Sequence, residues 1–269
     1  VGIQYIQMIS ILGIPTDKHS SFLEGAALAP PLIIKEFYSE AGNLFTENGI
    51  DLGKEGYWKD LGSIELMNPE HEFDKIKDSI EDVLNNRNYP ISIGGDHSIT
   101  YPIIAGYHKF YPKVNILHFD AHPDLYENFE NDPFSHASPF ARIMENNLAN
   151  ELIQIGIRTM TNHQKDQVDK YKIKVITMNE FSSDLVLKFD DPVYISIDLD
   201  GLDPAYAPGV SHPEPGGLST RDMLKIISNI DGEVIGGDIV EYNPKKDINN
   251  ITAVTAAKLL KELMGKILK

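Results

Sequence analysis

The chain has 269 residues, of which 42% are hydrophobic, and its 40 acidic and 24 basic residues give a formal net charge of −16. This charge argues against nucleic acid and anionic membranes as partners and favours metal cations or positively charged substrates. The absence of cysteine excludes disulfides and thiolate metal sites, and it is typical of a cytoplasmic protein.

Apolar runs that we interpret as buried strands recur along the chain. They are 6–14, 91–93, 114–119, 152–157, 175–178, 193–199 and 234–239. The chain before residue 14 lacks the basic segment and small-residue cleavage site of a secretory signal, so we expect no signal peptide. No run approaches the roughly 20 apolar residues that a membrane-spanning helix needs.

Helical patterns lie between several of these runs. Pro69 opens the first, and Ser219 with Asp222 resembles a capping pair ahead of the second. A third helix covers about 251–268. This alternation favours an α/β fold whose central, mostly parallel sheet carries helices on both faces. Because no Ser/Gly linker divides the chain, we expect a single domain, 1–269.

Three short acidic segments follow three of the strand-like runs. They are 94–98, 120–124 and 198–200. Alternate side chains of a strand share a face, so Asp120, His122 and Asp124 can point the same way, and Asp198 and Asp200 can do likewise. In open α/β sheets, ligands bind beyond the carboxyl ends of strands, where these segments lie. So many carboxylates would repel one another without cations between them. We therefore predict that they bind a metal cluster and that the protein is an enzyme.

Six side chains are the candidate metal ligands. They are His97, Asp120, His122, Asp124, Asp198 and Asp200. Two divalent cations neutralise the four aspartates, whereas one cation leaves two negative charges in one pocket. Oxygen ligands with a few imidazoles suit Mn²⁺ best, with Zn²⁺, Co²⁺ and Fe²⁺ as alternatives. Two such metals lower the pKa of a shared water, which predicts hydrolysis at a carbon or phosphorus centre.

The same segments closely resemble the three signatures of the ureohydrolases, the arginase/agmatinase family. They read GGDHS at 94–98, FDAHPD at 119–124 and SIDLDGLDP at 196–204, and the loops 20–31 and 207–217 also match the family. The resemblance covers nearly the whole chain. It implies a three-layer α/β/α fold, a binuclear Mn²⁺ centre and assembly into homo-oligomers, either trimers or hexamers.

The resemblance also implies a reaction and assigns the ligands to the two metal ions. In this family, metal-bridging hydroxide attacks a guanidinium carbon and releases urea and a primary amine. His97 and Asp124 would hold one metal and His122 the other. The remaining three aspartates would bridge the metals or complete their ligand shells.

Two further residues take roles from the resemblance and join Asp124 in the expected catalytic set. Glu241, in VEYNP at 240–244, matches the glutamate that binds the substrate guanidinium, a planar cation suited to a carboxylate. His136, in SHASPF at 135–140, matches a mobile histidine that would pass a proton to the departing amine. The alternative for His136 is a loop residue that shapes the entrance.

Other polar residues near the signatures are expected to support the site. His118 lies two residues before Asp120 and so shares its face of the predicted strand, where it would hydrogen-bond that ligand. The alternative is a buried structural histidine. Asp96 and Asp203 flank ligands, and we expect them to fix loops. His212, in the Pro/Gly-rich loop after the third signature, is a candidate substrate contact.

At two positions this chain differs from animal-type arginases, and both positions bear on which substrate tail is bound. Those enzymes read the α-carboxylate of arginine partly through an Asn, where this chain has Tyr126, and the α-amino group through an Asp, where it has Thr161 and its neighbours. Both departures favour agmatine, a small cation that would yield putrescine and urea. Segments 126–144 and 207–219 also resemble plant-type arginases, from an agmatinase-like branch that accepts either substrate. Arginine, guanidinobutyrate and guanidine therefore remain alternatives.

Two other functional classes remain open. A metal-dependent deacetylase with one Zn²⁺ would share the fold, but two cations and four aspartate ligands argue against it. An inactive ureohydrolase-like scaffold protein would keep the fold without turnover, but the intact ligand positions argue against that interpretation.

Overall fold

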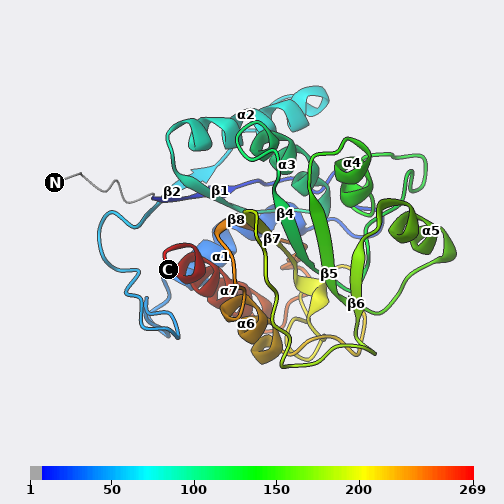
Figure 1. The fold of residues 1–269 in the computed structure, drawn as a ribbon. Helices are drawn as coiled ribbons and strands as arrows, with labels where there is room; N and C mark the ends of the chain where they lie inside the picture. Colours follow the sequence, from blue (N-terminus) through cyan, green and yellow to red (C-terminus); the bar gives the residue numbers. More distant parts are fainter. Residues whose placement is uncertain (1–7) are drawn as a thin grey trace.

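The centre of the molecule is an eight-stranded sheet. The computed structural model describes residues 8–269, so the beginning of the predicted strand 6–14 lies outside the described residues. The strand order is β2-β1-β3-β8-β7-β4-β5-β6, and every neighbouring pair is parallel (Figure 1). The predicted parallel α/β sheet is confirmed. The strands are β1 (Ile9–Gly13), β2 (Trp58–Ser63), β3 (Tyr89–Ile93), β4 (Asn115–Phe119), β5 (Glu151–Ile157), β6 (Lys174–Thr177), β7 (Val193–Asp198) and β8 (Val234–Val240).

The central strands and the edge strand β2 differ in burial. Every residue of β3, β8, β7 and β4 is buried, as expected for parallel strands that are covered on both faces. In β2 the first residue is half-buried and the rest are exposed. Its sequence, WKDLGS, contains no apolar run, and the sequence analysis therefore did not predict it.

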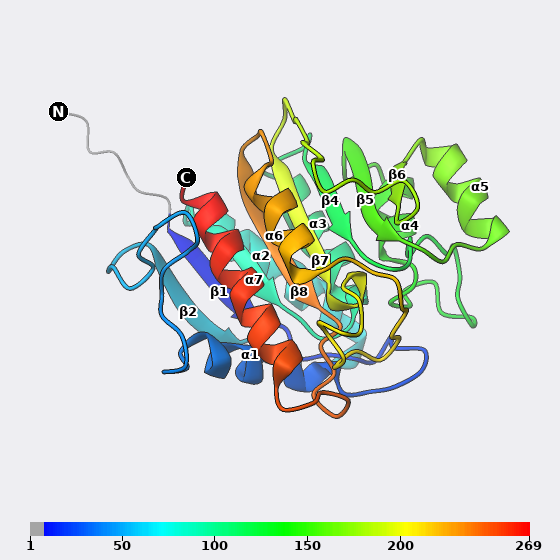
Figure 2. The ribbon, with the colours of Figure 1, turned by 90° about the horizontal axis from the view of Figure 1, so that it is seen from below.

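Helices cover both faces of the sheet and give the three-layer arrangement that the sequence predicted. Helices α2, α3 and α4 lie on one face, α1, α6 and α7 lie on the other, and α5 lies beyond β6 (Figures 1 and 2). The helices are α1 (Ala29–Phe37), α2 (Glu72–Asn85), α3 (Thr100–His108), α4 (Pro139–Glu145), α5 (Asn162–Tyr171), α6 (Thr220–Ser228) and α7 (Ile251–Ile267). No helix within 8–269 has the length and hydropathy to cross a membrane.

The predicted helix starts agree with the structure. Pro69 begins a short 3₁₀ helix, Pro69–His71, that leads into α2. Ser219 and Asp222 form a reciprocal capping box at α6, in which each backbone N–H donates to the other residue's side chain at 3.0 Å. These caps satisfy amide groups that the helices cannot pair internally.

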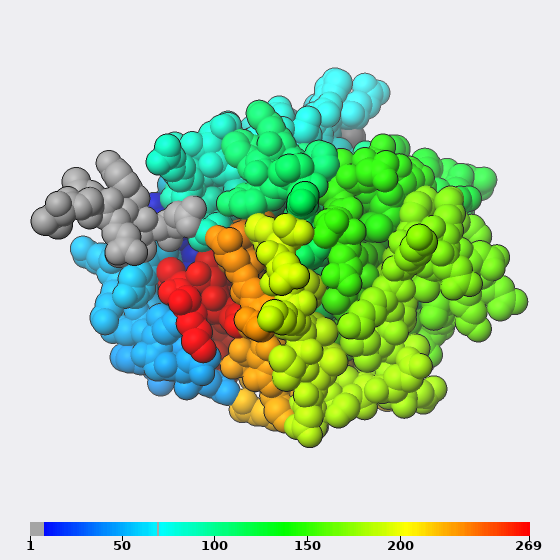
Figure 3. Space-filling model, viewed as in Figure 1, coloured from blue at the N-terminus to red at the C-terminus, as the bar shows by residue number. Residues whose placement is uncertain are grey.

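The long connection between α1 and β2 packs against α7 on the surface (Figure 3). The Glu47 N–H donates to Glu262 Oε1 at 2.9 Å, and Lys261 Nζ donates to the Asn43 carbonyl at 2.8 Å. Arg221 of α6 pairs with the Glu47 carboxylate. This connection is therefore held against the layer formed by α1, α6 and α7.

The carboxyl ends of β3, β8, β7 and β4 meet at one edge, because these strands are neighbours and run parallel. The three acidic segments follow β3, β4 and β7, and Glu241 follows β8 directly. The topology thus brings together residues as far apart in the sequence as His97 and Glu241. They meet at the carboxyl ends of the central strands, where the order of the strands reverses and where ligands bind in open α/β sheets.

Candidate active site

The six predicted metal ligands converge in two groups that share Asp120. One group contains His97, Asp120, Asp124 and Asp198, the other contains Asp120, His122 and Asp200, and the ligand atoms of each group lie within 4.8 Å of one another. The sequence-predicted set is thus brought together as a whole, and the two oxygens of Asp120 face different imidazoles.

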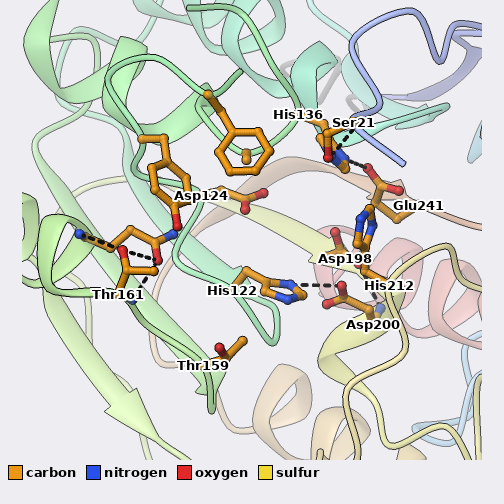
Figure 4. A pocket seen from close by; sticks show the side chains of 14 residues that line it. Ser21, His122, Asp124, His136, Thr159, Thr161, Asp198, Asp200, His212 and Glu241 are labelled. Atoms are coloured by element: carbon orange, nitrogen blue, oxygen red, sulfur yellow. Dashed lines mark hydrogen bonds and ion pairs between the residues drawn. The ribbon is translucent and has the colours of Figure 1, made fainter. Parts of the chain in front are cut away.

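Each imidazole faces several carboxylate oxygens through its Nδ1 atom. His97 Nδ1 lies 3.3 Å from Asp120 Oδ2, 3.1 Å from Asp124 Oδ2 and 3.2 Å from Asp198 Oδ2. His122 Nδ1 lies 3.4 Å from Asp120 Oδ1 and 3.1 Å from Asp200 Oδ2 (Figure 4 shows the latter contact).

The residues of both groups fit divalent cations. His97 Nδ1 is buried and has no hydrogen-bond partner, although it faces three carboxylates. Burial and Asp120 raise the pKa of Asp124 to about 7 and that of Asp200 to about 6. Burial lowers the pKa of His122, but Asp200 and Asp120 together raise it to about 12. The cluster therefore attracts positive charge, which metal ions would supply more fully than protons do.

Turns, and not strand alternation, direct the second acidic segment into the site. β4 ends at Phe119, and Asp124 has a left-handed backbone with φ of 50°. The Asp120 carboxylate accepts the His122 N–H at 2.6 Å and so turns the chain directly after the strand. The strand alternation that we applied to Asp120, His122 and Asp124 therefore does not extend past Phe119, although the three side chains still reach the cluster.

The third acidic segment turns in the same way. Asp198 is the last residue of β7, and its Oδ1 accepts the Asp200 N–H at 2.7 Å as a 3₁₀ helix begins. Gly201 ends that helix and lies against Asp120, where a Cβ atom would come within 2.8 Å of the Asp120 nitrogen. The close approach of these two segments therefore depends on a glycine at this position.

The structure places His118 directly under the shared ligand. His118 Nε2 lies 2.8 Å from Asp120 Oδ2, and Gln154 Nε2 donates to His118 Nδ1 at 3.0 Å. Burial lowers the pKa of His118 to about 4, so the neutral ring donates its Nε2 proton to Asp120. Gln154 was not predicted from the sequence, although a glutamine within an apolar strand is a usable signal, and the structure places it in register with His118.

A pocket of about 210 Å³ opens over the cluster (Figure 4). Its wall includes every residue that the sequence analysis proposed for substrate binding, namely Tyr126, Thr161, His212 and Glu241, and also His136. Further wall residues, which were not proposed from the sequence as substrate contacts, are Ser21, Phe129, Ala137, Thr159 and Gln164. No lysine or arginine lines this pocket among residues 8–269.

Glu241 holds its carboxylate inside the pocket wall. It is buried and has a left-handed backbone, with φ of 65°, directly after β8. Oε1 accepts the His97 N–H at 2.9 Å and lies 2.8 Å from His136 Nδ1. Burial raises the pKa of Glu241, but His136 and the His97 amide lower it below its ordinary value. The carboxylate is therefore ionised beside the metal ligands.

His136 joins two loops that are distant in the sequence. Its Nε2 lies 2.8 Å from Ser21 Oγ, and its backbone N–H donates to the His19 carbonyl at 3.0 Å. Burial lowers the pKa of His136, but Glu241 raises it to about 9. Glu241 therefore favours the protonated form of the His136 ring.

Asp96 and Asp203 hold loops at the edge of the site, as the sequence predicted. Asp96 is buried, and it accepts the Ser98 N–H at the start of the short 3₁₀ helix His97–Ile99 and the His19 N–H, both at 3.0 Å. Asp203 accepts the N–H groups of Ala205 at 2.9 Å and Gly216 at 2.7 Å and closes the Pro/Gly-rich loop.

The remaining predicted residues form the outer wall. Tyr126 stacks on His163, with ring centroids 5.7 Å apart and an interplanar angle of 11°. Thr161 caps α5 with its hydroxyl. The His212 ring lies 5.2 Å from that of His136. Burial lowers the pKa of His212, which therefore stays neutral at pH 7.

Comparisons with known proteins give a consistent result. A family model described as the arginase family matches residues 7–265. A mitochondrial arginase from Medicago truncatula is 44% identical over 277 residues, covering 97% of this chain and 82% of that protein. An agmatinase from Halalkalibacterium halodurans is 34% identical over 204 residues, covering 73% and 70%. The solved structure of the arginase from Medicago truncatula has a TM-score of 0.94 at 42% identity, covering 97% of this chain and 88% of that chain.

Proposed function

The chain belongs to the arginase family and is a hydrolase of guanidino compounds, and we propose that it releases urea from L-arginine, with agmatine as the second candidate substrate. The observation that carries the proposal is the ionised Glu241 carboxylate in the wall of the pocket that opens over the metal ligands. A guanidinium bound to Glu241 would lie beside the cluster. Family membership also removes the deacetylase interpretation.

Six residues would hold two divalent cations. His97, Asp124 and Asp198 would hold one, His122 and Asp200 the other, and Asp120 would serve both. When bound, such a pair acts as a Lewis acid that lowers the pKa of water toward neutrality. We propose Mn²⁺ because the ligand set combines oxygens and imidazoles without sulfur.

Glu241 would bind and orient the guanidinium. A carboxylate and a guanidinium match in charge and planarity, and their hydrogen bonds strengthen where water is excluded. The amide of His97 holds Oε1 in place, so the carboxylate is fixed before the substrate arrives. This preorganisation aligns the guanidinium carbon with the cluster.

His136 would carry the proton that the departing amine needs. Its Nδ1 now lies 2.8 Å from Glu241 Oε1, the acceptor proposed for the guanidinium. A substrate on Glu241 would release the imidazole from that contact, and the ring would then give its proton to the amine nitrogen. Ser21 steadies the opposite nitrogen of the ring.

Different observations favour the two substrates. Arginine is favoured because the Medicago truncatula arginase is 44% identical and covers 97% of the chain. Thr159, Thr161 and Gln164 are uncharged polar groups in the wall that would accommodate an amino-acid head. Agmatine, the expectation from the sequence, is favoured because no lysine or arginine of the described residues lines the pocket to pair with a carboxylate.

The test is urea release by the Mn²⁺-reconstituted protein from L-arginine, agmatine, guanidinobutyrate and guanidine, assayed side by side. We expect the highest kcat/KM with L-arginine, and a higher value with agmatine would make agmatine the preferred substrate. Glu241→Gln should lower kcat/KM about 30-fold or more, since removing one charge from a buried pair costs about 2 kcal/mol or more. Two bound metals without urea from any compound would instead support the inactive scaffold.

A further inference from the structure

A chain of polar side chains lies behind His97, at the ring nitrogen that does not face the cluster. Ser196 of β7 and Asp238 of β8 are register partners, and both are fully buried. His97 Nε2 lies 2.9 Å from Ser196 Oγ, and Ser196 Oγ donates to Asp238 Oδ1 at 2.7 Å. Asp238 does not line the pocket, so substrate contact does not explain this buried carboxylate.

The other oxygen of Asp238 is also occupied by hydroxyl donors. Tyr194 Oη and Thr100 Oγ1 both donate to Asp238 Oδ2 at 2.8 Å. Three hydroxyl groups thus donate to the two oxygens of Asp238, and a serine hydroxyl has only one proton to give. The Ser196 proton is therefore committed to Asp238.

This commitment determines which nitrogen of His97 carries a proton. Ser196 can offer only a lone pair to the imidazole, so His97 Nε2 must be the donor. A neutral imidazole has a single N–H, which leaves the lone pair on Nδ1. Nδ1 is the buried atom without a hydrogen-bond partner, and it faces Asp124 and Asp198 at 3.1 and 3.2 Å.

We propose that Asp238, acting through Ser196, is a positioning residue that holds the proton of His97 on Nε2 and so presents Nδ1 to a metal ion. The inference rests on the proposed function, because it assigns a task to residues behind one of the proposed metal ligands. Partners that orient a metal-binding histidine in this way commonly contribute 10- to 100-fold to metal affinity.

Neither Ser196 nor Asp238 was predicted from the sequence to support the site. Ser196 precedes the ligand Asp198 by two residues and shares its face of β7, together with Tyr194. Asp238 interrupts the apolar strand β8 at the position that pairs with Ser196. The hydrogen-bonded chain of His97, Ser196 and Asp238, which we call the relay, thus depends on the pairing of β7 with β8. Residue spacing along the sequence does not predict this pairing.

The test is Mn²⁺ binding by Ser196→Ala and Asp238→Asn, starting from the metal-free protein and counting free Mn²⁺ by electron paramagnetic resonance. Each variant should bind one of the two ions about 10- to 100-fold more weakly while the other ion keeps its affinity. Tyr107→Phe is the matched control, because Tyr107 is a buried neighbour of Tyr194 whose hydroxyl, within the part of the chain that the structure describes, hydrogen-bonds to the Pro90 and Ile235 carbonyls and not to Asp238. It should bind both ions as the wild type does, even if its melting temperature in EDTA falls.

Each outcome has a defined meaning. Unchanged affinity for both ions in Ser196→Ala and Asp238→Asn would overturn the proposal, and so would an equal loss in Tyr107→Phe. If Asp238→Asn does not fold, Ser196→Ala decides alone. Wild-type protein that binds two Mn²⁺ but releases no urea would overturn the proposed function and leave the relay intact. Wild-type protein that does not bind two ions would overturn both.

Discussion

The floor and the rim of the pocket are built differently. The floor is the metal-ligand cluster at the ends of β3, β4 and β7, where Asp120 and His97 are fully buried and anchored to the strands beneath. The rim is the outer wall formed by Tyr126, Thr161 and His212, which lie on connections and are partly or largely exposed.

The difference assigns separate tasks to the two regions. The floor concentrates charge in a fixed arrangement, which determines the kind of chemistry, because electrostatic catalysis requires groups that do not reorganise. The rim holds neutral side chains around the space for the tail of the substrate, which determines the compound. We therefore expect changes in the floor to abolish turnover and changes in the rim to alter preference.

The largest effect is expected from Asp124→Asn in the floor. The change removes one of the four charges that attract the metals and should weaken metal binding and urea release by more than about 100-fold, beyond the usual effect of residues behind the ligands. Metal content and urea release of the purified variant measure this. Asp184→Asn, which alters only a surface pair with Lys225, is the control. Wild-type turnover in Asp124→Asn would show that Asp124 is not a metal ligand.

A smaller effect is expected at His136, where floor and rim meet. His136→Ala should slow urea release about 100-fold, the lower end of what proton transfer contributes, while both Mn²⁺ ions stay bound. Metal analysis and kcat from the same preparation test this directly. Loss of metal with the imidazole would show that His136 belongs to the floor and does not act as a proton carrier.

The smallest effect is expected from Tyr126→Phe in the rim. The ring and its stack on His163 would remain, and only the hydroxyl would be lost. Because one hydrogen bond contributes about 0.5–1.5 kcal/mol, the ratio of kcat/KM for arginine to that for agmatine should change about 2- to 10-fold. Tyr206→Phe, on the loop outside the pocket wall, is the control. An equal loss with both substrates would assign Tyr126 to structure and not to specificity.

The floor could be predicted from the sequence because its signals are local. Asp120 and Asp198 lie immediately after, or at the end of, buried apolar strands, and parallel topology brings such ends together. Strand alternation nevertheless does not describe 120–124, because β4 ends at Phe119 and the Asp120 carboxylate then accepts the His122 N–H in a turn. Side-chain hydrogen bonds of this kind compete with the backbone hydrogen bonds between strands, and the spacing of apolar residues in the sequence does not reveal which will form.

The rim and the supporting groups were harder to predict because their contacts are distant in the sequence. Ser21 meets His136 across 115 positions, and Ser196 meets Asp238 across 42. Neither contact has a local pattern. The edge strand β2 was missed for a different reason, since exposed polar residues give no alternation to detect.

The most direct test of the account is a crystal structure of the Mn²⁺-reconstituted protein with anomalous scattering recorded at the manganese edge. We expect two anomalous peaks, one among His97, Asp124 and Asp198 and one between His122 and Asp200, with Asp120 contacting both. A single peak, or a peak outside these two groups, would contradict the binuclear floor on which the proposed function depends.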